Sequence, residues 1–80
     1  MFRKVGRYKE ALKQFNKLET LLSTPDKTVY YERGIVFQII DNHQRAKKDF
    51  KKSIELDKEY ALAYYCLGKS RLELYKMNVS

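Results

Sequence analysis

The sequence repeats itself at a fixed interval, and this interval constrains the fold more than any other feature of the chain. A tyrosine followed four residues later by a glycine occurs as Tyr30 with Gly34. The same pair returns 34 residues further on as Tyr64 with Gly68. Recurrence at a period of this length is typical of stacked helical units and not of a compact enzyme.

A second pattern, an alanine followed four residues later by a phenylalanine, occurs at Ala11 with Phe15 and again at Ala46 with Phe50. Apolar residues around both pairs follow steps of three and four, as on one face of an α-helix, and strand-like alternation is absent. We therefore predict a helix over residues 27 to 40 and a second helix over 43 to 56. The residues expected in the core are Tyr30, Phe37, Phe50, Ile54, Leu56 and Tyr64.

Glycine inside a helix costs roughly 0.5–1 kcal/mol relative to alanine, so two glycines at matching positions indicate a packing benefit. We expect Gly34 to let two helix backbones approach, with Ala46 as its small partner.

Helix ends are indicated by capping residues and turns. Thr24, Pro25 and Asp26 predict a helix start, with Thr24 as the cap, Pro25 in the first turn and Asp26 opposite the helix dipole. Asp41-Asn42 and Asp57 are expected to cap the next two helices. The remaining expected turn is at Gly6-Arg7-Tyr8.

These patterns resemble the tetratricopeptide repeat family, whose unit carries aromatic, glycine, alanine and aromatic residues at similar spacing. The resemblance implies an all-α chain of antiparallel helix-turn-helix repeats, stacked as a short α-solenoid of about two to two and a half repeats. Residues 1–26 would end a first repeat, 27–60 would form a complete repeat, and 61–80 would start a further one. The chain departs from the family pattern where Arg33 replaces a leucine, Arg71 an aromatic residue and Lys58 a proline. His43 and Met77 stand where the family commonly has the tyrosine of a turn between helices.

Because the family's first helices line a concave groove, the resemblance implies a non-catalytic scaffold that receives a peptide or helix of a partner protein. Tyr31 and Tyr65 are the expected anchors. The implied groove residues are Thr28, Tyr31, Ile35, Gln38 and Ile39 from one repeat and Leu62, Tyr65, Lys69, Leu72 and Glu73 from the next. This mostly aliphatic and aromatic surface favours an apolar or amphipathic segment.

One specific function of the family, clamping the acidic C-terminal tails of chaperones, is disfavoured. The family's clamp needs asparagine, lysine and arginine at three positions where this chain has Glu32, Leu62 and Cys66. Glu32 would repel a carboxylate.

The formal net charge of +7 keeps a second hypothesis open. Lysines four residues apart on two helices predict a basic convex face that could bind a polyanion such as RNA, an anionic membrane or tubulin. The residues of this predicted face are Lys13, Lys17, Arg45, Lys48 and Lys52. A third hypothesis is a structural spacer within a large assembly.

Catalytic and metal-binding patterns are missing from the sequence. The single histidine, His43, lacks the further donors that a metal site needs, and no phosphate loop or nucleophile motif occurs. We therefore expect no enzyme activity, no cofactor and no bound metal. The lone Cys66 is interpreted as a small apolar core residue, in keeping with a reducing, cytoplasmic location.

No run of apolar residues is long enough for a membrane span, and no signal peptide opens the sequence. The chain is expected to open within one helix and to stop at the start of another. It would then be part of a longer solenoid, with terminal repeats that could self-associate.

Overall fold

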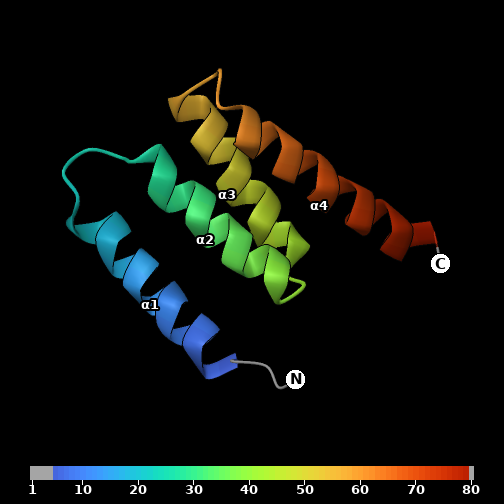
Figure 1. The fold of residues 1–80 in the computed structure, drawn as a ribbon, viewed down its shortest axis with the longest axis horizontal. Coiled ribbons are helices and arrows are strands. Elements are labelled where there is room, and N and C mark those ends of the chain that lie inside the picture. The colour runs from blue at the N-terminus through green and yellow to red at the C-terminus, as the bar shows by residue number, and fades with distance from the viewer. Residues whose placement is uncertain (1–4, 80) are drawn as a thin grey trace.

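The computed structural model describes residues 5–79, and within them the chain is all-α, with four packed helices and no strand (Figure 1). The helices are α1 (Val5–Leu21), α2 (Lys27–Ile39), α3 (His43–Leu56) and α4 (Ala61–Val79). The predicted helices over 27–40 and 43–56 are thus confirmed, the first ending one residue early.

Each helix packs on the one that follows it in the chain. α1 contacts α2, and α3 lies between α2 and α4, so that it contacts both of them (Figure 1). The molecule is elongated and thin, with principal extents of 42 × 32 × 18 Å. This leaves one broad side of α1 and one of α4 without a helix against them.

Short polar side chains set where α2 and α3 begin. Asp26 is the N-cap of α2, and its carboxylate accepts the Thr28 N–H at 2.8 Å. Asn42 is the N-cap of α3 and accepts the Arg45 N–H at 3.3 Å. The Asn42 cap is confirmed, but the assignment of Thr24 was wrong. Aspartate caps as well as threonine, and Asp26 stands directly before the first helical residue.

Asp57 does not cap the last helix either. It is the C-cap of α3, its carboxylate accepts the Glu59 N–H at 3.0 Å, and it pairs with Lys27. α4 begins only at Ala61, after a turn in which the Tyr60 N–H donates to the Asp57 carbonyl at 3.1 Å. Asp57 therefore stabilises the turn and ties α3 to the start of α2.

Two expected turns are helical in the structure. Gly6-Arg7-Tyr8 lies inside α1, and α4 runs without interruption past Met77 to Val79, so no second helix starts near the end of the described residues. No glycine or proline follows Gly68 in the sequence, which removes the residues that most often stop a helix. The part of the first expected repeat that precedes Val5 lies outside the described residues.

The core centres on Phe50, which is fully buried. A Cβ added at Gly34 would lie 2.7 Å from Cε1 of Phe50, so the ring of Phe50 takes the place that a side chain on α2 would need. The expected partner of Gly34, Ala46, is also fully buried, but the aromatic ring is what makes glycine necessary. Gly68 has nothing within 4 Å of an added Cβ, so the expected packing benefit is absent there.

The buried cluster joins residues of three helices: Phe37, Ala46, Phe50, Cys66 and Leu67, with Leu12, Tyr31, Ile35 and Ile54 packed against it. Tyr30 is buried as expected, at 8% exposed. Tyr64 and Leu56 were wrongly placed in the core, since they are 49% and 40% exposed. Tyr64 is half open to water because none of the four described helices covers it.

Arg33, a departure from the family pattern, joins three helices through its guanidinium group. It donates to both carboxylate oxygens of Asp49 at 2.8 and 2.7 Å, and to Glu19 and Asn16 of α1 at 2.6 and 2.8 Å. The Glu19 carboxylate also accepts the Tyr30 hydroxyl at 3.1 Å. Because Asp49 is only 5% exposed, this fork of hydrogen bonds is what makes its burial tolerable.

Candidate functional site

The most exposed apolar side chains of the predicted groove stand on α4 and at the end of α2. Leu62, Tyr65 and Leu72 are 56%, 66% and 52% exposed. Their spacing of three and seven residues places them along one side of α4. Ile39, at the last turn of α2, is 49% exposed. These four side chains are not used to hold the described helices together.

A hollow of about 400 Å³ lies between the end of α2 and the middle of α4. Its lining residues are Gln38, Ile39, Asp41, His43, Lys69 and Glu73. Four of these were predicted for the groove, Gln38 and Ile39 from one repeat and Lys69 and Glu73 from the next, at least 30 positions further along the chain. The structure therefore brings the two predicted halves of the groove together at this point.

Two predicted groove residues, Tyr31 and Gln38, are largely engaged in joining helices. The Tyr31 ring lies 6.0 Å from the Phe50 ring and 5.2 Å from the Tyr60 ring, between centroids. Burial is the main reason why the pKa of Tyr31 is raised above its ordinary value. Tyr31 is therefore half-buried and packs between helices, so its ring is not free to anchor a partner. The Tyr65 side chain is exposed.

Gln38 ties α2 to α4 with both hydrogens of its amide. Its Nε2 donates to the Cys66 carbonyl at 3.1 Å and to the Ser70 hydroxyl at 3.0 Å. Ser70 is fully buried, so this pair of bonds satisfies polar groups that have no access to water. Gln38 thus lines the hollow and links α2 to α4 beside it.

The other predicted groove residues have different surroundings. Thr28 is exposed in the first turn of α2, and Ile35 is half-buried against the core. The Lys69 ammonium lies 5.5 Å from the centroid of the Tyr65 ring, within the range of a cation–π contact. Lys69 and Glu73 add one charge of each sign beside the hollow.

Sequence reasoning missed Asp41 and His43 as lining residues of the hollow. His43 is 7% exposed, with Nε2 3.5 Å from Oδ1 of Asp41, and its Nδ1 has no hydrogen-bond partner among residues 5–79. Asp41 takes a left-handed backbone with φ of 65° in the turn between α2 and α3. That conformation lies in the turn that leads from α2 into α3, and only the Asp-Asn dipeptide indicated it in the sequence.

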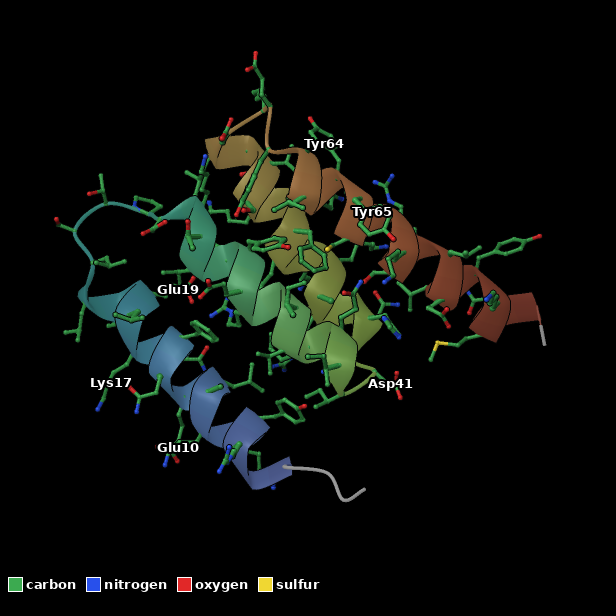
Figure 2. The ribbon with its side chains drawn as sticks, viewed as in Figure 1. Glu10, Lys17, Glu19, Asp41, Tyr64 and Tyr65 are labelled. Carbon is green, nitrogen blue, oxygen red and sulfur yellow. The ribbon has the colours of Figure 1, made fainter. Side chains whose placement is uncertain are left out.

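The predicted basic residues lie on two helices, α1 and α3. Lys17 and Glu19 project from opposite sides of α1, and it is Glu19 that faces α2 (Figure 2). Lys13 lies one turn before Lys17 and shares its side. The basic residues of α1 therefore point away from the hydrogen bonds that join α1 to the rest of the molecule.

The basic residues of α3 border a separate hollow of about 280 Å³ between α1, α2 and α3. Arg45 and Lys48 line it together with Asn16, Arg33, Phe37 and Asp49. The Arg45 guanidinium lies 5.9 Å from the centroid of the Phe37 ring, and the Lys52 ammonium lies 3.8 Å from the Glu55 carboxylate. Two of the five predicted basic residues are thus already in contact with a neighbour.

Within residues 5–79, no group of three or more His, Cys, Asp or Glu side chains is arranged to hold a metal ion. Cys66 is buried in the core, where it packs with Phe50 and Leu67. Among the described helices, none combines the length and the apolar character that crossing a membrane requires.

Comparison of the chain with protein-family models, with curated proteins and with solved structures found no match. The resemblance to tetratricopeptide repeats accordingly stays a prediction from the spacing of aromatic, glycine and alanine residues.

Proposed function

We propose that the chain is a tetratricopeptide-like, non-catalytic scaffold that binds an amphipathic segment of a partner protein along α2 and α4. The observation that carries this proposal is the row of exposed apolar side chains at Ile39, Leu62, Tyr65 and Leu72, which runs beside the hollow lined by Gln38. Large apolar groups gathered on one face are what a partner helix or peptide buries.

The charged residues beside the row suggest how a segment would be oriented. Lys69 and Glu73 lie one turn apart at the hollow, so a bound helix would place an acidic side chain near the first and a basic one near the second. The apolar residues supply the affinity and this pair supplies the direction. Tyr65 is the proposed anchor, because it is the most exposed aromatic residue of the predicted groove.

The proposal is tested by capturing partners on the immobilised chain at low and at high salt, followed by mass spectrometry. Two groove variants, Tyr65→Ala and Leu62→Glu, are compared with two matched controls, Tyr75→Ala and Leu21→Glu. The control side chains are 64% and 73% exposed and lie outside the predicted groove. All four substitutions alter side chains that are more than half exposed, so the helices are expected to persist.

The expected result is a protein that is retained at high salt by the wild-type chain and by both controls, and lost from both groove variants. Apolar contacts are weakly screened by salt, whereas binding to a polyanion falls steeply as salt rises. Capture only at low salt, abolished by the pair Lys48→Glu and Lys52→Glu, would overturn the groove proposal in favour of the basic residues. Binding that no variant changes would favour the spacer hypothesis.

A further inference from the structure

α4 carries an open copy of a surface that is covered in α2. On α2, the ring of Phe50 from α3 covers Gly34, at 2.7 Å from the place of an added Cβ. On α4, Gly68 stands 34 residues later and an added Cβ would meet nothing within 4 Å. The tyrosines at corresponding positions differ in the same way: Tyr30 on α2 is 8% exposed, whereas Tyr64 on α4 is 49% exposed. The side of α4 that corresponds to the α3 contact of α2 is therefore uncovered.

α1 carries the other half of the same contact. Its Ala11 and Phe15 stand 35 residues before Ala46 and Phe50, the α3 side chains that are fully buried in the core. Ala11 and Phe15 are only half-buried, and Leu18 one turn later is 41% exposed. Within residues 5–79, α1 thus resembles α3 in its alanine and phenylalanine, but no glycine-bearing helix covers them as α2 covers Ala46 and Phe50.

We propose that a second copy of this chain covers α4 with its α1, head to tail, and so rebuilds between two molecules the pairing that joins α2 to α3 within one. Phe15 of the second copy would lie over Gly68 as Phe50 lies over Gly34. The two uncovered faces belong to different ends of the molecule (Figure 1), so each copy can offer one and receive the other.

The aromatic contacts of the internal pair have counterparts in this arrangement. Within the chain, the rings of Tyr31 and Phe50 are 6.0 Å apart between centroids. The corresponding residues are Tyr65 on α4, which is 66% exposed, and Phe15 on α1. Docking would therefore bury Tyr65 against an aromatic ring, so a second copy and the partner segment of the proposed function would compete for this side chain.

One pair of opposite charges stands at corresponding positions of the two faces. Within the chain, the Arg45 guanidinium lies 5.9 Å from the Phe37 ring. At the corresponding positions α4 has Arg71 and α1 has Glu10, both exposed. The cation–π contact of the internal pair would thus be replaced by an ion pair between copies. Arg71 of one copy would then have Glu10 of the other copy as its partner.

When α1 of one copy covers α4 of another, the first copy still has an uncovered α4 and the second an uncovered α1. Such heterologous contacts give rings or open chains of copies, not a two-fold dimer that stops at two. Sedimentation velocity over a wide range of protein concentration distinguishes these cases, because the average mass rises beyond that of two copies for rings or open chains and levels off at two copies for a two-fold dimer.

The sharpest single variant is Gly68→Ala. In one copy the added methyl group meets only open space, and alanine favours the helix, so the melting temperature of the isolated chain should rise by about 4 °C. Between copies the same methyl group would collide with Phe15, so self-association should weaken more than tenfold. A structural defect would lower both quantities, whereas the proposal requires them to change in opposite directions.

Charge reversal supplies the matched test. Glu10→Arg alone and Arg71→Glu alone should each weaken self-association several-fold, and the double variant should restore it, because every contact then regains an opposite pair. Mixing Gly68→Ala with Glu10→Arg should give a 1:1 complex from two weakly associating variants, since the first keeps an intact α1 and the second an intact α4. A chain that is monomeric at all concentrations, a dimer that stops at two copies, or self-association indifferent to these variants would overturn the proposal.

Discussion

Arg33 of α2 and Asp49 of α3 face each other through two parallel hydrogen bonds, 2.8 Å from Nε to Oδ2 and 2.7 Å between the second nitrogen and Oδ1. Both side chains are shielded from water, at 13% and 7% exposed. The pair accounts for the arginine at position 33, since the buried carboxylate that faces it on α3 needs a cation.

Removing one member of this pair should be far more damaging than removing an exposed lysine. Arg33→Leu leaves the Asp49 carboxylate buried and unpaired, which should lower the free energy of unfolding by about 3–5 kcal/mol. Urea denaturation followed by circular dichroism measures this, with Lys48→Leu as the exposed control. Replacing both Arg33 and Asp49 by leucine should recover most of the loss. A single variant as stable as the control would contradict the account of the pair.

Acid should weaken the fold through two carboxyl groups. The hydrogen bond from Arg33 is the main reason why the pKa of Glu19 lies below its ordinary value of 4.5, and Lys27 lowers the pKa of Asp57 below 3.8 in the same way. A lowered pKa stabilises the folded chain above the pKa of the unfolded chain, and this contribution is lost as the pH falls through the lowered value. The melting temperature should therefore decline as the pH drops below about 4.5.

The variant Glu19→Gln tests the share of that decline due to Glu19. The melting temperature of this variant should be lower than that of wild type near neutral pH. It should also fall less on acidification, because the amide does not titrate. Thermal melts between about pH 2 and pH 7 measure both slopes. Parallel curves for the two proteins would show that Glu19 contributes nothing to the pH dependence.

The two glycines of the repeat should respond in opposite directions to the same substitution. Gly34→Ala places a methyl group 2.7 Å from the Phe50 ring and should cost about 1–3 kcal/mol of unfolding free energy. Gly68→Ala meets open space and should add roughly 0.5–1 kcal/mol. Denaturant titrations at low protein concentration give both values. Equal effects of the two substitutions would be inconsistent with the packing described.

Cys66 should be protected from thiol reagents by the fold. It is 6% exposed and packed against Phe50 and Leu67, so a reagent can reach the sulfur only when α4 separates from α3. We expect labelling of the native chain to be at least about a hundredfold slower than labelling in denaturant, and to accelerate in Phe50→Ala. Rapid labelling of the folded chain would mean that the α3–α4 contact is loose.

Local patterns predicted the helices well, because their causes are local. The three- and four-residue apolar steps located α2 and α3 almost to the residue, and Asn42 was recognised as a cap from its type and place. The role of Asp57 depends on Lys27, a residue 30 positions away, and no short-range pattern could have shown it. The continuous α4 differs from the turn expected near Met77, because the sequence after Gly68 contains no glycine or proline to stop the helix.

The candidate site was predictable in outline and not in detail. The 34-residue period brought Ile39 and Lys69 to the same hollow, as expected. It could not show that Tyr31 would be taken up by the rings of Phe50 and Tyr60, since Tyr60 has no counterpart in the pattern used. Burial of a predicted contact residue depends on neighbours that only the folded chain supplies.

Backbone chemical-shift mapping of the wild-type chain, titrated with an apolar, helical segment of a captured partner, tests the central claim most directly. The account predicts that the largest changes cluster at Ile35, Ile39, Leu62, Tyr65 and Lys69, and that they persist at high salt. Changes centred on Lys48 and Lys52, or spread evenly over all four helices, would contradict a binding face formed by α2 and α4.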